Sequence, residues 1–150
     1  MAWFSCRGFA WSLVGLLSIA CEEASPPEPL VPANYETFEE VRDCRFSVEH
    51  SAVHIRIVTS PAAERTYLDG DQPFEPGALV VKLEYRDGEC RDLTGFTAMR
   101  RLAEGEDPEV GDWEWQRLDA ERNVIDIDDA ACASCHRSCD RGHDGVCADP

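Results

Sequence analysis

The stretch ALVVKLEYR, residues 78–86, decides the fold of this chain. It is rich in apolar and β-branched residues that alternate in character, which favours a β-strand. Asp87-Gly88 follows at once, and this dipeptide is typical of a tight hairpin turn. We therefore expect a strand over 78–86, a turn, and a return strand over about 89–101. A hairpin of this kind indicates an antiparallel sheet.

Further strands are expected on both sides of this hairpin. Residues 52–59 alternate strictly, with Val53, Ile55 and Ile57 on one face. Residues 113–118 alternate again, and 124–127 form a short apolar piece. The polar stretch 103–112 is expected to be a loop.

Short helices are predicted between and after these strands. Ser60-Pro61 and the residues that follow favour a helix to about residue 68. Asn34 precedes Phe38 and Val41 at helical spacing, which predicts a helix over 35–43. Asp128-Asp129 precedes an Ala/Cys-rich segment, where acids favour a helix N-terminus. The predicted fold class is α+β and β-rich, an antiparallel sheet with short helices at its edges.

The chain of 150 residues is long enough for a single domain behind an export signal. Residues 1–20 have a basic residue, an apolar core and a small-x-small cleavage site, the pattern of a signal peptide. LSIAC, residues 17–21, resembles a bacterial lipobox with Cys21 as the lipidated residue. Residues 21–34 are rich in Pro and Glu and predict an extended tether, which leaves 35–150 as the domain. We expect export to the periplasm, either without an anchor or with a lipid anchor in the outer membrane.

The charge of the chain narrows its partners. Asp and Glu number 30 against 14 Lys and Arg, a formal net charge of −16. Such a charge repels phosphate backbones, so we expect no nucleic-acid partner. Small neutral or cationic ligands remain, as does a basic protein such as a redox partner.

The chemistry is carried by CASCH, residues 132–136, which has the C-x-x-C-H pattern of covalent haem attachment. On one helical turn, Cys132 and Cys135 can bond the two vinyl groups of one porphyrin, and His136 can then bind the iron. Two alternatives stay open. One is a redox-active or disulfide-bonded pair of cysteines, and the other is a zinc site chosen from Cys132, Cys135, His136, Cys139, His143 and Cys147.

The remaining cysteines suggest disulfides, because exported proteins fold in an oxidising environment. Four thiols allow three pairings, and we favour Cys44 with Cys90 and Cys139 with Cys147, because the latter pair is local in sequence. The four cysteines are Cys44, Cys90, Cys139 and Cys147.

The motif specifies only one axial ligand of the iron. Met99 is the only methionine besides the initiator, and it falls in the predicted sheet. If Met99 reached the iron, the protein would be a His/Met electron-transfer cytochrome. An open sixth position, suited to small-molecule chemistry or binding, is the reading we favour.

Five segments follow one another in the chain: the tyrosine-led 35–41, VHIRIV at 53–58, GALVVK at 77–82, GDW at 111–113 and the late C-x-x-C-H motif. Taken in this order, over residues 35–136, they resemble the cytochrome P-460 family, which includes cytochrome c′-β. This resemblance implies a β-rich domain that packs on one c-type haem, usually in a homodimer, and that oxidises hydroxylamine or binds nitric oxide.

The resemblance also implies roles for individual residues. Lys82 matches the lysine that bonds covalently to the porphyrin, Arg56 matches an arginine of the distal pocket, and His136 matches the proximal ligand. Lys82 is also the chain's single lysine. In so apolar a strand its amine is expected to be partly desolvated, which lowers its pKa and makes it more nucleophilic.

Overall fold

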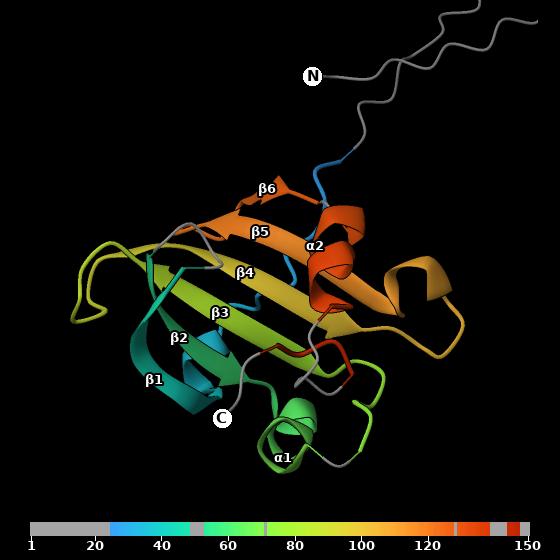
Figure 1. The fold of residues 1–150 in the computed structure, drawn as a ribbon. Coiled ribbons are helices and arrows are strands. Elements are labelled where there is room, and N and C mark those ends of the chain that lie inside the picture. Colours follow the sequence, from blue (N-terminus) through green and yellow to red (C-terminus); the bar gives the residue numbers. More distant parts are fainter. Residues whose placement is uncertain (1–24, 49–52, 71, 128, 139–143, 148–150) are drawn as a thin grey trace, which may run out of the picture.

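The computed structural model of the protein describes residues 25–48, 53–70, 72–127, 129–138 and 144–147. A six-stranded antiparallel sheet forms the body of this part, and its strands lie side by side in chain order (Figure 1). This confirms the predicted β-rich α+β class. The strands are β1 (Glu39–Ser47), β2 (Val53–Thr59), β3 (Leu79–Tyr85), β4 (Leu93–Arg101), β5 (Trp113–Asp119) and β6 (Val124–Asp126).

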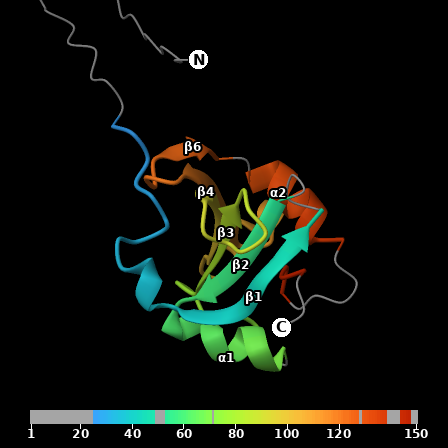
Figure 2. The same cartoon turned by 90° about the vertical axis from the view of Figure 1, so that its left-hand side faces the viewer.

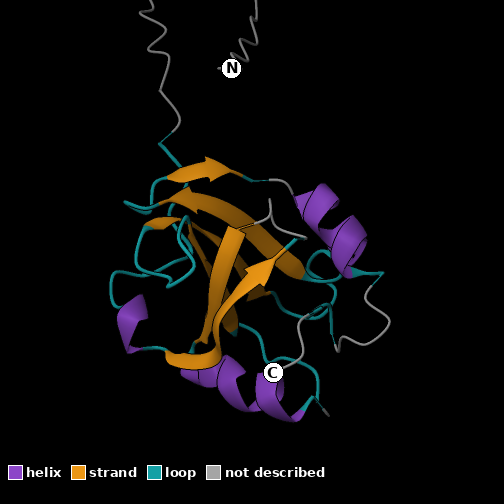
Figure 3. Cartoon of the chain, turned by 60° about the vertical axis from the view of Figure 1, so that its left-hand side comes forward, coloured by secondary structure: helices purple, strands orange, loops and turns teal. Residues whose placement is uncertain are grey.

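Short helical segments accompany the sheet (Figure 3). The predicted helix after Ser60 is confirmed and ends where Gly70 adopts a left-handed φ of 68°. The Ser60 hydroxyl accepts a hydrogen bond from the amide of Leu79 at 3.0 Å, and so ties the start of this helix to β3. The segments are η1 (Tyr35–Thr37), α1 (Pro61–Asp69), η2 (Pro108–Val110) and α2 (Asp129–His136).

The sheet has apolar side chains on both faces. One face carries Val81, Leu83, Phe96 and Leu118, and residues 30–38 cover it; we call it the closed face. The opposite face packs against α1, α2 and residues 144–147, and we call it the pocket face (Figure 2). Its buried members on the strands are Ile55, Ile57, Val80, Met99, Trp113 and Trp115.

The predicted tether is shorter than expected, because its last residues belong to the core. Leu30 is 8% exposed and Val31 is fully buried against the closed face. The Leu30 amide donates to the side-chain oxygen of Gln116 at 2.8 Å, and the Gln116 amide donates to the Glu28 carbonyl at 3.0 Å. Burying these two apolar side chains is favourable in free energy. The high proline content of the segment indicated a tether and gave no sign of this burial.

The predicted helix over 35–43 is wrong beyond its first turn. Only Tyr35–Thr37 is helical, as η1, and Glu39–Ser47 forms β1 instead. Phe38 packs against the closed face and Val41 against the pocket face. Residues three apart lie on opposite faces of an extended chain, so the spacing that suggested a helix also serves a strand.

The predicted disulfide between Cys44 and Cys90 is present. It joins β1 to the turn between β3 and β4, with 5.9 Å between the two Cα atoms. Cys147 is also disulfide-bonded, whereas Cys139 lies outside the described residues. The expected signal peptide over 1–20 and the lipidation site Cys21 lie outside them as well. Among the described helices, none is long and apolar enough to cross a membrane.

Candidate functional site

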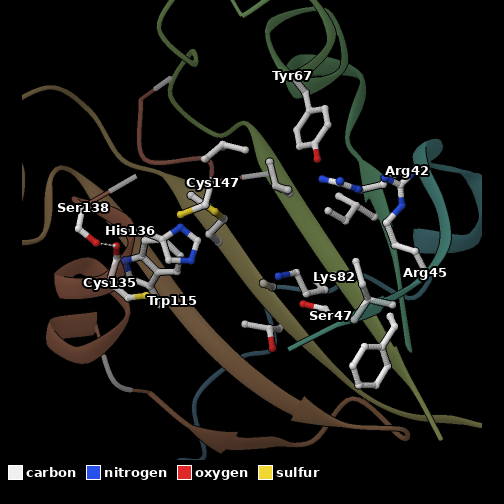
Figure 4. A pocket seen from close by; sticks show the side chains of 18 residues that line it. Arg42, Arg45, Ser47, Tyr67, Lys82, Trp115, Cys135, His136, Ser138 and Cys147 are labelled. Carbon is white, nitrogen blue, oxygen red and sulfur yellow. Dashed lines mark hydrogen bonds between the residues drawn. The ribbon is translucent and has the colours of Figure 1, made fainter. Parts of the chain in front are cut away.

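A cavity of about 370 Å³ opens on the pocket face (Figure 4). Its volume lies in the range of about 300–1,000 Å³ that small-molecule sites usually have. His136, Cys135 and Trp115 stand at one end, Arg42 and Arg45 at the other, and Lys82 between them. The cavity thus brings together residues from β1, β3, β5 and α2.

The C-x-x-C-H residues all lie on α2, as the sequence predicted. Cys132 is half-buried against the pocket face, and Cys135 is more exposed and lines the cavity. Both residues carry thiols. The helix sets Cys132 and Cys135 about one turn apart and places His136 directly after the second cysteine. The local geometry is therefore the one that the motif requires.

His136 is held in a defined orientation. Its Nδ1 lies 2.6 Å from the carbonyl oxygen of Gly145, and since a carbonyl can only accept, Nδ1 carries the proton. Its ring also packs against Trp115, with 4.4 Å between the ring centroids. Nε2 is then the unprotonated nitrogen of the neutral ring and can bind a metal.

The surroundings of His136 favour its neutral form. Burial lowers the pKa of His136, and the nearby charge of Lys82 lowers it further, whereas the hydrogen bond to Gly145 raises it. The net direction is downward from the ordinary value of 6.5. A neutral imidazole is the form that can bind a metal ion.

A short C-terminal segment provides the carbonyl that orients His136. The Asp144 carboxylate accepts a hydrogen bond from the Phe74 amide at 2.8 Å and lies 3.3 Å from Nη1 of Arg101. The indole N–H of Trp113 donates to the Asp144 carbonyl at 2.9 Å. Gly145 has a φ of +83°, and a Cβ there would lie 3.2 Å from Nε1 of Trp113. These contacts fix the backbone next to the Gly145 carbonyl.

Lys82 lies on the floor of the cavity, near the middle of β3. It pairs with Ile57 on β2 and with Thr97 on β4, and all three side chains line the cavity. Val80 lines the cavity too, as expected for a residue that shares a face with Lys82. Glu84 is on the same face, where it accepts a hydrogen bond from Thr97 at 2.6 Å. The structure thus brings Lys82 and His136 into one cavity.

Arg56 is not brought to this cavity. It alternates with Ile55 and Ile57, which line the cavity, so its side chain leaves the other face of β2. There Nη1 of Arg56 lies 3.2 Å from a carboxylate oxygen of Glu40, and the guanidinium stands 6.0 Å from the ring centroid of Tyr85. The distal-pocket role expected for Arg56 is not supported by this placement.

Two arginines that the sequence analysis did not single out line the cavity instead. Arg42 pairs with Ile57 and Arg45 with Ile55, because the pairing of β1 with β2 shifts register on either side of Arg42. Such bulges re-aim side chains, so two residues three apart reach the same face. Regular alternation would have put them on opposite faces, and no sequence signal marks the bulge.

The donor set and the cavity fit a c-type haem. Two thiols on one helical turn, an imidazole with Nε2 unprotonated, and an adjacent cavity are what covalent attachment and axial ligation need. Cys132 and Cys135 would form the two thioether links, and His136 would bind the iron. Haem would supply a redox-active iron that also binds small ligands.

The zinc alternative loses one of its six candidate ligands. Within the described residues, no group of three or more His, Cys, Asp or Glu side chains is arranged to hold a metal ion. Cys147 is disulfide-bonded, which removes its thiolate as a ligand. Cys139 and His143, the other residues that this alternative could use, lie outside the described part of the chain.

Comparisons with known proteins do not assign this chain to a family. No protein-family model matches the sequence, and no curated protein matches it either.

Proposed function

We propose that this protein is an exported mono-haem c-type cytochrome whose iron takes small nitrogen species, either oxidising hydroxylamine or binding nitric oxide. One observation carries the proposal: the C-x-x-C-H helix directs His136 into a cavity while the Gly145 carbonyl holds its Nδ1. A histidine with this second hydrogen bond has a fixed ring orientation and a more basic Nε2, as metal-binding histidines commonly do.

The partners follow from charge and from the resemblance to cytochrome P-460. Hydroxylamine oxidation releases electrons, so it needs an acceptor, and the net charge of −16 favours a basic redox protein in that role. The resemblance implies a homodimer. Nitric oxide binding needs neither an acceptor nor a proton-transfer group, and it is the simpler of the two activities.

The decisive experiment is a spectrum of the mature, exported protein. We expect a Soret band that stays with the polypeptide through acid-acetone extraction, because thioether bonds hold the haem covalently. His136→Ala should keep the covalent haem but lose the axial ligand, which shifts the Soret band. A protein with stoichiometric zinc and no Soret band would overturn the proposal and favour the zinc site.

Met99 offers a second reading, because it lines the same cavity and is only 6% exposed. If its sulfur bound the iron, the protein would be an electron carrier with no open position. We expect a five-coordinate reduced iron that binds carbon monoxide or nitric oxide within mixing time at neutral pH. A stable six-coordinate, low-spin spectrum in the wild type, lost in Met99→Ala, would favour the electron carrier.

Lys82 distinguishes the two nitrogen activities. A bond from its Nζ to the porphyrin would replace one N–H and one C–H, and the two electrons and two protons would pass to an oxidant such as hydrogen peroxide, which would be reduced to water. We expect proteolysis to release a haem peptide that contains residues of both β3 and α2, two hydrogen masses lighter than its parts. Lys82→Ala should abolish hydroxylamine oxidation and leave nitric oxide binding. A wild-type haem attached only to Cys132 and Cys135 would leave ligand binding as the better reading.

A further inference from the structure

One end of the cavity carries positive charge in a strongly acidic protein. Arg42, Arg45 and Lys82 line it, and no Asp or Glu is among its lining residues in the described part of the chain. The whole chain has a net charge of −16. Cations gathered in a concave, partly apolar site favour an anionic ligand, contrary to what the overall charge indicates.

The register of β1 creates this positive end. Arg42, Ile57 and Lys82 form one row across β1, β2 and β3, and Arg45 stands beside Ile55 in the next row on the same face. Neighbouring strands lie about 4.8 Å apart, so Arg42 and Lys82 flank the space above Ile57 at about twice that separation. Without the two register shifts in β1, only one of the arginines would face the cavity.

Arg42 and Arg45 keep N–H donors that could bind a ligand. Nη2 of Arg45 lies 2.6 Å from a carboxylate oxygen of Asp43, whose side chain is 77% exposed. A pair so exposed to water is weak, and a guanidinium has four further N–H donors. Nε of Arg42 is buried and has no hydrogen-bond partner among the described residues. The remaining N–H donors of Arg42 are on its Nη atoms, which lie beyond Nε on the side chain.

We propose that Arg42 and Arg45 bind a carboxylate at this end of the cavity. Two guanidinium groups on one face match the planar, two-oxygen geometry of a carboxylate, which a lysine alone does not. The carboxylate has two sources: the propionates of a haem attached at the opposite end, or a small free carboxylate. The first source rests on the proposed function, whereas the second does not.

The experiment uses the protein as purified, with formate as the free probe and chloride at equal ionic strength as its control. Arg42→Gln and Arg45→Gln remove the proposed ligands. Arg56→Gln is the matched control, because it removes the same charge from the other face of the neighbouring strand. Tryptophan fluorescence reports on the cavity through Trp115, and circular dichroism checks that each variant is folded. Arg42→Lys keeps the charge and removes the planar guanidinium.

If the site takes a free carboxylate, formate but not chloride should change the fluorescence of the wild type with saturation. Its affinity should fall at least about tenfold in the Arg42 and Arg45 variants, including Arg42→Lys, and stay unchanged in Arg56→Gln. This result would hold even if the protein carried no haem, so it separates this inference from the proposed function.

If the site holds haem propionates, formate should not bind at the arginines, so any effect that it has on the wild type should be unchanged in Arg42→Gln and Arg45→Gln. The reduction potential should then depend on pH through propionate ionisation. The midpoint of that dependence should move up by about one pH unit in Arg42→Gln or Arg45→Gln, because losing a cation raises the pKa of a carboxyl group. The inference is overturned if chloride acts like formate, or if neither readout changes more in these variants than in Arg56→Gln.

Discussion

The two faces of the sheet are formed by the same strands but are packed differently. On the closed face, Val81, Phe96 and Leu118 are at most 1% exposed and pack against the N-terminal segment. On the pocket face, Lys82 interrupts the apolar surface, and the covering elements leave a cavity of about 370 Å³. Along β3, residues of the closed face alternate with residues of the pocket face. The closed face is fully packed, whereas the pocket face keeps a cavity, so substitutions on each should have separable effects.

The largest effect is expected on the closed face. Phe96→Ala removes a ring that is 1% exposed and contacts the ring of Tyr35 at 5.0 Å between centroids. We expect the free energy of unfolding to fall by about 3–5 kcal/mol in urea titrations. Phe46→Ala on the cavity rim, where the ring is 55% exposed, should cost less than about 1 kcal/mol. Equal losses at both positions would remove the distinction between the faces.

The second-largest effect is expected from loss of the disulfide between Cys44 and Cys90. It closes a loop with a sequence separation of 46 residues and attaches β1, the strand with both cavity arginines, to the rest of the sheet. Replacing both cysteines by serine should lower the free energy of unfolding by about 2–4 kcal/mol. Reductant should lower the stability of the wild type at least as far, because it also breaks the disulfide of Cys147. A variant as stable as the oxidised wild type would show that β1 is held by its strand pairing alone.

A substitution at Asp144 tests how far the pocket face depends on residues 144–147, which pack against it. Asp144→Asn removes the negative charge beside Arg101, whose side chain is only 13% exposed. We expect a loss of about 1–3 kcal/mol in the free energy of unfolding, together with a shift in the Soret band of the proposed haem, because the backbone of Asp144 adjoins the carbonyl that holds His136. Asp92→Asn is the control, because its pair with Arg86 is exposed and is worth less than about 1 kcal/mol. A change in stability without a change in spectrum would contradict a role in orienting His136.

The smallest effect concerns Asp112, in the loop before β5. Hydrogen bonds from the amides of Gly105 and Asp107 hold the pKa of Asp112 below its ordinary value of 3.8. Its carboxylate therefore stabilises the fold above the unfolded pKa, and this contribution disappears as the pH falls through the folded pKa. Asp112→Asn should be less stable than wild type at pH 7, and the difference should shrink as the pH falls through the acid range; thermal melts at a series of pH values measure it. A difference independent of pH would mean that the charge is not what matters.

The sequence predicted those parts of the fold that depend on local pattern. The pairing of β3 with β4 follows from alternation, but β4 begins at Leu93 and not at about residue 89, so a longer loop stands where Asp87-Gly88 predicted a tight turn. The start of α1 follows from Ser60-Pro61. The Cys44–Cys90 disulfide could be proposed from the number of cysteines. For these features the deciding residues are neighbours in the chain, or are few enough to count.

Features that depend on distant partners were missed. Val31 was assigned to a tether because nothing local shows that the closed face needs a cover. Alternation on β3 showed that Lys82 shares a face with Val80, but not which face has the cavity. Arg42 and Arg45 were missed because a bulge is a property of the pairing between β1 and β2, not of β1 alone.

The burial of Leu30 and Val31 sets how far the domain could stand from a membrane. Only eight residues, 22–29, separate Cys21 from Leu30, the first of these two buried residues. Fully extended, they span at most about 28 Å, roughly twice the radius of gyration of a small domain, about 13 Å. Residues 22–29 would thus be a short tether between a lipid on Cys21 and the domain. The part of the sheet beside Gln116, where the chain enters, would then stay close to the lipid headgroups. The proposed redox partner would have to approach from the sides that face away from the membrane.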